Sequence, residues 1–265
     1  GIVELINFAH GDLFMLTTII AAGLMVGLLG VNQLTAISIL ALLLALVVCM
    51  AAGGFINMSA EFLAYRRLRS APKLAPLMTA VGISFIFRGI AQQEYVNGSA
   101  QKNWPISWGG PQVEGVYIYK LVMVFAVTVP LLLLMTWIVS RTKMGKAMRA
   151  VAQDQDGARL MGINVNGTIS FVFGLGGALA GAAGVLYFLC QTQTYYDTGT
   201  QLGLIAFTAA VLGGIGSLPG AMLGGLLIGL IEAFWSGYFS VEYKDVAAFA
   251  ILVVVLIFMP TGLLG

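Results

Sequence analysis

Charged residues are scarce in this sequence. They make up only 9% of its 265 residues, whereas hydrophobic residues make up 59%. Soluble chains carry about 25% charged residues, so a chain with this composition cannot cover its exterior with groups that water solvates. The composition therefore excludes an ordinary water-soluble domain and places most of the exterior against lipid. The apolar runs are unbroken rather than alternating, which disfavours a transmembrane β-barrel.

Residues that could carry out catalysis are also few. The sequence has one histidine, His10, and two cysteines, Cys49 and Cys190, which both fall inside apolar runs. We interpret the cysteines as small buried hydrophobic residues, and one histidine supports neither a metal site nor a proton relay. The sequence contains no Gly-x-x-x-x-Gly-Lys-Ser/Thr segment, the pattern of an ATP-binding P-loop. We therefore expect no enzymatic activity, no metal, no cofactor and no nucleic-acid partner.

Long apolar runs without charges predict membrane-spanning helices. A span needs about 20 residues to cross a hydrocarbon core of about 30 Å. The runs lie at 13–31, 33–56, 74–91, 117–139, 168–190 and 246–259. We expect an all-α, polytopic transmembrane helical bundle with about seven to eight membrane elements, forming a single domain over residues 1–265.

The apolar stretch from 203 to 235 is too long for one span, because a continuous helix there would measure about 50 Å. Glycine frees the backbone and proline blocks helix continuation, so we expect a broken or re-entrant element whose first part, 203–214, is too short to cross alone. The residues of the break are Gly213, Gly214, Gly216, Ser217, Pro219 and Gly220. Irregular backbone at membrane depth needs protein or a watery cavity around it, so these residues are candidates for lining a polar path.

Glycines also recur four residues apart, a spacing that favours close helix crossing. The pairs are Gly177 with Gly181, Gly216 with Gly220, Gly220 with Gly224, and Gly225 with Gly229.

Basic residues are concentrated in two connectors, which the positive-inside rule places in the cytoplasm. One connector holds Arg66, Arg67, Arg69 and Lys73, and the other holds Arg141, Lys143, Lys146, Arg149 and Arg159. Segments 92–116 and 191–202 then lie outside. The C-terminus is cytoplasmic if the broken element returns to its side of entry, and outside if it crosses.

The connector 141–166 combines these charges with apolar residues. Its segment 145–161 predicts a short helix or helix pair that stops at Gly162. We interpret it as a docking element for a partner protein; the alternative is a solvated loop that only fixes topology. The apolar candidates are Ala147, Met148, Val151, Leu160 and Met161. The candidate coupling residues are Gly145, Met148, Arg149, Asp154, Leu160 and Gly162.

A polar cluster precedes the first predicted span. Asn7, His10 and Asp12 are candidates for the translocation path because ionisable groups beside a span are often functional. They are equally candidates for a structural cluster that caps a helix beginning near residue 13. Arg88, Lys120 and Glu232 lie near predicted helix ends, where long side chains reach the interface, and we interpret none of them as a site for a coupling ion.

Five segments in order resemble the permease subunits of bacterial branched-chain amino-acid ABC importers. They are 5–12, 61–69 with 71–72 and 74–76, 143–162, 209–225, and 242–245 with 259–262. In that family a further helix precedes the Asn-Phe-Ala-His-Gly motif, so we expect one before Gly1. Phe8 favours the amino-acid branch over related permeases for urea and short amides.

The resemblance implies a multi-pass protein of the bacterial inner membrane that lines a path for leucine, isoleucine and valine. It also implies a homologous second permease, two cytoplasmic ATPase subunits, a periplasmic substrate-binding protein and a lipid environment. Segment 141–166 would be the cytoplasmic coupling loop that docks on the ATPase. The alternatives are a related importer permease for urea, short amides or other amino acids, and a self-contained secondary transporter or channel.

Overall fold

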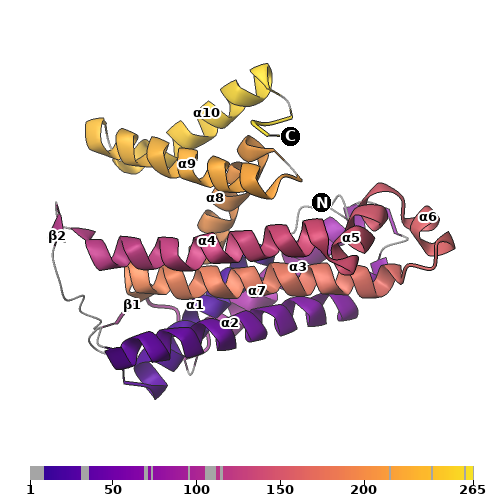
Figure 1. The fold of residues 1–265 in the computed structure, drawn as a ribbon. Coiled ribbons are helices and arrows are strands. Elements are labelled where there is room, and N and C mark those ends of the chain that lie inside the picture. The colour runs from indigo at the N-terminus through magenta and orange to yellow at the C-terminus, as the bar shows by residue number, and fades with distance from the viewer. Residues whose placement is uncertain are drawn as a thin grey trace. The chain divides into compact units, whose positions relative to one another are not determined.

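Helices make up most of the structure, a computed structural model (Figure 1). It describes residues 9–30, 36–68, 71–72, 74–94, 96–104, 112–113, 116–214, 216–239, 241–259 and 261–264. Within these ranges, six helices are long and apolar enough to cross a membrane: Ala9–Leu28, Leu40–Leu68, Leu74–Ala91, Lys120–Arg141, Val165–Gln191 and Leu218–Tyr238. The shorter apolar helix Thr198–Gly213 accompanies them. The chain is therefore a polytopic transmembrane helical bundle, as predicted.

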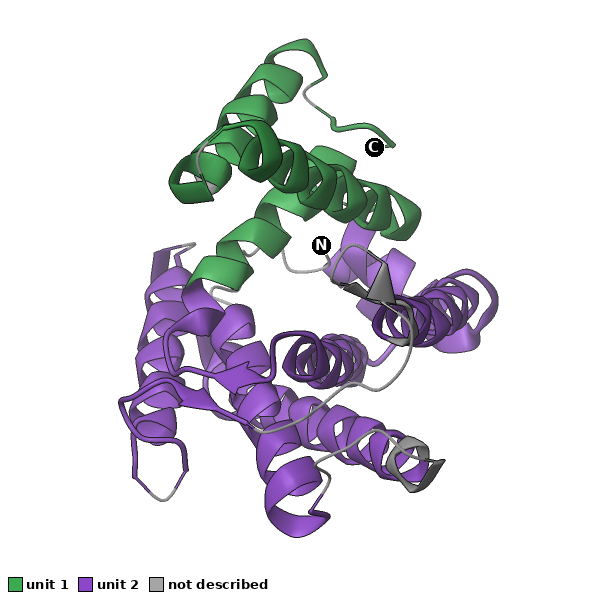
Figure 2. Cartoon of the chain, turned by 90° about the vertical axis from the view of Figure 1, so that its left-hand side faces the viewer, with its two compact units in different colours: residues 1, 201–265 green, residues 2–200 purple. Residues whose placement is uncertain are grey.

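The chain divides into two compact units (Figure 2). Residues 2–200, drawn in purple, are called the first unit because they come first in the chain, and residues 201–265, drawn in green, are called the second unit. That both units belong to one permease domain stays a prediction. The helices of the first unit are α1 (Ala9–Ala22), continued by a π-helical segment (Gly23–Leu28), α2 (Ala36–Leu63), a 3-10 turn (Tyr65–Leu68), α3 (Leu74–Ala91), α4 (Ile118–Arg141), α5 (Lys143–Gln153), α6 (Gln155–Leu160) and α7 (Val165–Gln191). Its strands β1 (Lys102–Asn103) and β4 (Gln193–Thr194) pair antiparallel, as do β2 (Gln112–Val113) and β3 (Val116–Tyr117).

Helices α2 and α7 lie side by side and antiparallel (Figure 1). A Cβ at Gly177 of α7 would meet the backbone of Gly53 on α2, and one at Gly181 would meet the backbone of Cys49. Backbones approach this closely only where side chains are absent. Cys49 is fully buried in the core that this contact creates. The predicted packing of the Gly177 and Gly181 pair is thereby confirmed.

The second unit contains the predicted break. Helix α8 (Thr198–Gly213) ends where Gly214 and Gly216 adopt φ angles of 106° and 108°, a region that favours glycine. Helix α9 (Leu218–Tyr238) then starts at a Ser217 cap, whose Oγ accepts from the Gly220 N–H at 3.1 Å. A 3-10 turn (Val241–Tyr243) and α10 (Lys244–Phe258) follow. The break is confirmed, but α8 starts at Thr198 rather than at 203, so its 16 residues span about 24 Å.

Two of the four glycine pairs of the sequence pattern do not pack helix against helix. Gly220 and Gly224 do, because a Cβ on either would meet backbone of α8 at Gly213 or Ala209. A Cβ at Gly216 or Gly229 would meet nothing within 4 Å among the described residues. Gly216 instead serves the turn through its positive φ. The expected close contacts of the Gly216 with Gly220 pair and of the Gly225 with Gly229 pair are therefore wrong.

The chain end closes the second unit by returning to the break. The backbone N–H groups of Leu263 and Leu264 donate to the carbonyls of Leu212 and Gly213 at 3.0 and 3.1 Å. The last carbonyls of a helix lack partners inside the helix, so these two bonds stabilise the C-terminal end of α8. The helix carbonyls just before the break are thereby satisfied by protein.

Candidate functional site

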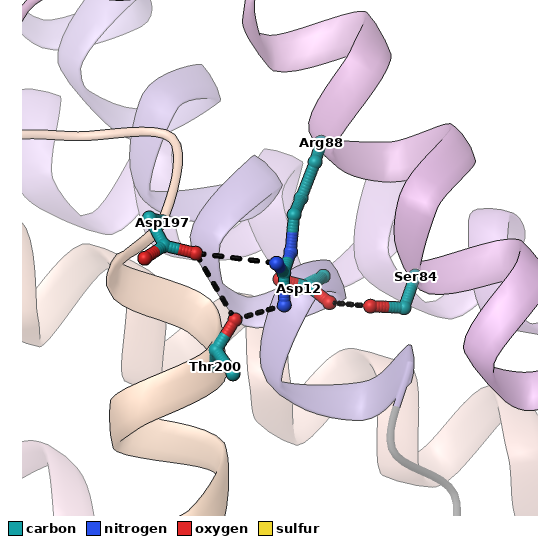
Figure 3. Close-up of polar contacts among 5 residues, drawn as sticks. All are labelled: Asp12, Ser84, Arg88, Asp197 and Thr200. Atoms are coloured by element: carbon teal, nitrogen blue, oxygen red, sulfur yellow. Dashed lines mark hydrogen bonds and ion pairs between the residues drawn. The ribbon is translucent and has the colours of Figure 1, made fainter.

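An ion-pair network joins α1, α3 and the start of α8 (Figure 3). The Arg88 guanidinium on α3 lies with Nε 3.2 Å from Asp12 Oδ1 and with Nη1 3.3 Å from Asp197 Oδ1. Its Nη2 donates to the Thr200 hydroxyl, and the Ser84 hydroxyl donates to the Asp12 carboxylate. All five residues belong to the first unit. We call Asp12, Ser84, Arg88, Asp197 and Thr200 the Arg88 network.

The two carboxylates of the Arg88 network differ sharply in exposure. The Asp12 side chain is 1% exposed, whereas that of Asp197 is 50% exposed and that of Arg88 is 23% exposed. A buried carboxylate is destabilising unless charged or hydrogen-bonding partners accompany it, and Arg88 with Ser84 supplies them. The first turn of α8 comes this close to α1 because Gly199 has no side chain; a Cβ there would lie 2.8 Å from Asp12 Cα.

The structure corrects two interpretations of these charges. Helix α1 is already helical at Ala9, and the Asp12 carboxylate is bound by Ser84 and Arg88, so Asp12 does not cap a helix starting near residue 13. Arg88 was expected to extend to the membrane interface, but it points to Asp12 instead. An arginine inside the apolar run 74–91 was the signal for this role, since ionisable residues within a span usually have partners.

The other members of the predicted N-terminal cluster are not part of the Arg88 network. Asn7 lies outside the described residues. His10 is half-buried, and its Cε1 would lie 3.8 Å from a Cβ at Gly176 on α7. His10 and Asp12 therefore face different helices.

A second set of buried polar contacts, which the sequence did not predict, crosses the α2–α7 interface. The Asn57 amide Nδ2 donates to the Phe173 carbonyl at 2.6 Å, and the Ser170 hydroxyl donates to the carboxylate of fully buried Glu61. Glu61 follows the apolar run that ends at residue 56, so it seemed to belong to a connector. Helix α2 in fact continues to Leu63, which carries Glu61 into the interface.

The segment between α7 and α8 is held against the loop after α3. Strand β4 pairs with β1, the Trp104 indole donates to Thr194 Oγ1 at 3.1 Å, and Thr194 donates to Asn97 Oδ1 at 2.6 Å. Asn97 is fully buried. These contacts fix the segment that carries Asp197.

A narrow pocket adjoins the Arg88 network within the first unit. Its lining includes Met15, Thr18, Ile19, Tyr187, Tyr195 and Thr198. Met15 lies one helical turn after Asp12 on α1, and Thr198 directly follows Asp197. The Tyr195 and Tyr196 rings contact each other at 4.7 Å between centroids, and the hydrogen bond with Tyr196 raises the pKa of the Tyr195 hydroxyl. The pocket thus combines apolar side chains with polar, uncharged ones, which include Gln193 and Thr194.

The connector 141–166 forms the predicted helix pair. Thr142 Oγ1 caps α5 by accepting from the Gly145 N–H at 3.0 Å, and a Cβ at Gly145 would collide with the carbonyls of Ile138 and Val139. The Arg149 guanidinium donates to the Val139 carbonyl. Asp154 caps α6 by accepting from the Asp156 N–H at 2.9 Å. Gly145, Arg149 and Asp154 therefore shape the connector itself.

The apolar residues of the connector divide into a buried and an exposed set. Met148 is 4% exposed, and Val151 and Ala158 pack with Val165 and Ile169 of α7. The expectation that Met148 contacts a partner is wrong, because its side chain is already buried within this chain. Leu160 and Met161, in contrast, are 90% and 85% exposed at the end of α6, just before Gly162 turns the chain with a φ of 78°. We call Leu160 and Met161 the α6 tip.

Metal ligands do not gather in the described ranges, where no group of three His, Cys, Asp or Glu side chains could hold an ion. Cys49 and Cys190 are both free thiols.

Residues 1–256 match the family described as branched-chain amino acid transport system / permease component. The chain belongs to this family. It is 39% identical over 274 residues to the high-affinity branched-chain amino acid transport system permease protein BraD of Pseudomonas aeruginosa, and 39% identical over 280 residues to LivH of Escherichia coli K12. Each alignment covers 100% of this chain and 87% of the relative.

A more distant relative is the autoinducer 2 import system permease protein LsrC of Yersinia pestis, 28% identical over 47% of this chain and 40% of the relative. No solved structure matches the chain. Family membership and the apolar helices together make the chain a membrane permease subunit of an ABC importer, as the sequence resemblance implied. A permease of this kind is a transport component and not itself an enzyme.

Proposed function

We propose that this chain and a homologous second permease line the path for leucine, isoleucine and valine across the bacterial inner membrane. Two cytoplasmic ATPase subunits drive the transport, and a periplasmic substrate-binding protein delivers the amino acid. The observation that carries the proposal is the 39% identity to BraD and LivH over the whole of this chain.

The α6 tip supports the proposed contact with the ATPase. Apolar side chains this exposed on a polar, basic connector favour contact with another protein, and the positive-inside rule places the connector in the cytoplasm. Both helices of the connector pack on α7, since Val151 of α5 and Ala158 of α6 lie in one cluster with Val165 and Ile169, so force from this contact would pass to α7. The proposed coupling element is therefore the connector 141–166, with Leu160 and Met161 as its contact residues.

Two regions are proposed to line the path. The first is the break between α8 and α9, where Gly214, Gly216 and Ser217 lie outside the helices and Gly213, Pro219 and Gly220 lie at the flanking helix ends. The second is the Arg88 network. Ionisable residues within membrane segments often mark the route of a polar solute, which favours the Arg88 network over the apolar helix surfaces. Irregular backbone at membrane depth needs protein or a watery cavity around it, which favours the break.

The test is the ATPase activity of the purified complex. This chain is co-expressed with the second permease and the ATPase subunits, and hydrolysis is measured with binding protein that is either empty or loaded with leucine. We expect a stable complex whose hydrolysis rises with the loaded protein, and a preparation lacking this chain provides the control. Stimulation by a urea-binding protein instead would assign the chain to the urea branch. Leucine flux through the purified chain alone would indicate a secondary transporter.

A further inference from the structure

The Arg88 network contains one permanent and one exchangeable ion pair. The Asp12 side chain is 1% exposed, pairs with Arg88 Nε and accepts from the Ser84 hydroxyl. Breaking the Asp12–Arg88 ion pair would leave the buried Asp12 carboxylate without its charged partner. Asp197 is 50% exposed, and ion pairs that water reaches contribute little to stability. Arg88 can therefore release Asp197 at small cost while Asp12 keeps the guanidinium in place.

We propose that Arg88 and Asp197 bind the α-carboxylate and the α-ammonium group of the transported amino acid when their own pair separates. The proposal rests on the proposed function, because it takes the solute to be an amino acid. Asp12 acts as a positioning residue that does not contact the solute. Thr200, which accepts from Arg88 and lies with its Oγ1 3.3 Å from Asp197 Oδ1, bridges the two binding groups.

The charges of the network match an amino-acid zwitterion. Arginine presents a planar set of N–H donors that suits a carboxylate, and Asp197, once released, offers a carboxylate to an ammonium group. A solute with only a carboxylate would leave Asp197 beside a like charge. A solute with only an amine would leave Arg88 Nη1, which had faced Asp197, without a carboxylate acceptor. Only the zwitterion replaces both halves of the broken pair.

The adjoining pocket is closed in this conformation and is the proposed place for the aliphatic side chain once it widens. Met15 and Ile19 of α1 and Tyr187 of α7 give it apolar walls, and Thr198 connects it to Asp197. In this conformation the pocket is too narrow for a water molecule. The solute side chain therefore enters only when α1 and the 193–198 segment move apart, the same movement that separates Arg88 from Asp197.

The experiment measures binding of radiolabelled leucine to the importer complex in lipid nanodiscs, without the substrate-binding protein. The competitors are 4-methylpentanoate, which is leucine without its amine, and 3-methylbutylamine, which is leucine without its carboxylate. We expect saturable leucine binding to the unmodified complex, and much weaker competition by either fragment. Asp197→Asn should weaken leucine binding about tenfold, as expected for a lost charged hydrogen bond, and should remove the preference for leucine over 4-methylpentanoate.

Asp156→Asn is the matched control, because Asp156 is an exposed carboxylate paired with Arg159 at 3.1 Å on α6. It should leave leucine affinity and competitor preference unchanged. Arg88→Gln should abolish the preference for leucine over 3-methylbutylamine; if this variant does not fold, Asp197→Asn still decides the question.

Three results would overturn the inference. The first two are an unmodified complex without saturable leucine binding and an Asp197→Asn complex with unchanged affinity and unchanged preference. An Asp197→Asn complex that is less stable but keeps its preference would show that the network is only a structural link between helices, and would also overturn it. ATP hydrolysis stimulated by leucine-loaded binding protein is measured on the same preparations. If that stimulation is present while the inference fails, the proposed function stands; if it is absent from the unmodified complex, the proposed function fails as well.

Discussion

Replacing Gly177 by alanine tests whether backbone contact holds α2 and α7 together. A Cβ at this position would collide with the Gly53 carbonyl oxygen and lie 2.7 Å from the Asn57 Cβ. A carbonyl inside a helix is fixed by the helix, so it cannot move aside as the end of a flexible side chain could. The two helices must separate to admit one methyl group.

The magnitude follows from overpacking and from a neighbouring hydrogen bond. Overpacking a well-packed core costs about 1–3 kcal/mol. Separation also strains the 2.6 Å bond from Asn57 Nδ2 to the Phe173 carbonyl, and a buried polar group without a partner costs about 1–3 kcal/mol. We expect Gly177→Ala to lower the stability of the interface by about 2–4 kcal/mol. Gly176→Ala is the control, because its Cβ would have ordinary contacts at 3.8 Å and alanine favours helix over glycine by about 1 kcal/mol.

Cys49 provides the assay, since it is a native thiol buried in this interface with Sγ 3.8 Å from the Thr17 carbonyl. The rate at which a thiol reagent modifies Cys49 in detergent, measured by mass spectrometry of its peptide, reports the opening of the interface. We expect Gly177→Ala to raise this rate about 30-fold or more and Gly176→Ala to leave it near the unmodified rate. Equal rates in the two variants would refute close backbone packing of α2 on α7.

Three further predictions concern the connector, the break and the topology. Met148→Ala should destabilise the folded chain by about 2–5 kcal/mol because it leaves a cavity at a buried site. Leu160→Ala should leave stability unchanged and weaken ATPase docking by about 1–3 kcal/mol. Thermal unfolding measures the first effect, and stimulated ATP hydrolysis measures the second. Gly220→Leu should prevent assembly or transport, because any Cβ there meets the Gly213 carbonyl. In intact cells an impermeant thiol reagent should label Ser99→Cys and not Lys146→Cys.

Each of these predictions has a control and a contradicting result. Leu133→Ala is the control for Leu160→Ala, because it removes an equally apolar, 63% exposed side chain from α4 and should not affect ATPase coupling. If the double variant Leu160→Ala, Met161→Ala couples normally, the connector only fixes the topology. Gly229→Leu is the control for Gly220→Leu, because a side chain at Gly229 has open space among the described residues. If both variants fail to assemble or transport, the result would argue against a specific α8–α9 contact at Gly220. Labelling of Lys146→Cys but not of Ser99→Cys would show that the topology is the opposite of the predicted one.

Periodicity and composition predicted the helices well, because a bilayer requires long apolar runs with satisfied backbones. The break at Gly214 and Gly216 and the contact of Gly177 with α2 followed from local rules about glycine. Helix ends were predicted less accurately: α8 starts at Thr198 and α2 continues to Leu63, because polar residues at these ends form hydrogen bonds and ion pairs with other parts of the fold.

The polar contacts could not be predicted, because they depend on which helices become neighbours. Arg88 and Asp12 are 76 positions apart and Glu61 and Ser170 are 109 apart, and no local spacing relates such residues. The connector shows the same limit. Its amphipathic pattern predicted a helix pair but not which apolar residues the rest of the chain buries. Met148 and Leu160 were therefore predicted to have the same role, although Met148 is buried and Leu160 is exposed.

Leucine uptake into proteoliposomes tests the central claim that this chain is the permease of an ATP-driven importer. The complete complex is reconstituted with ATP on the ATPase side and leucine-loaded binding protein on the other, and radiolabelled leucine inside the vesicles is counted. The account predicts accumulation that requires ATP and is lost when this chain is omitted. Accumulation that persists without ATP, or that needs an ion gradient instead, would contradict it.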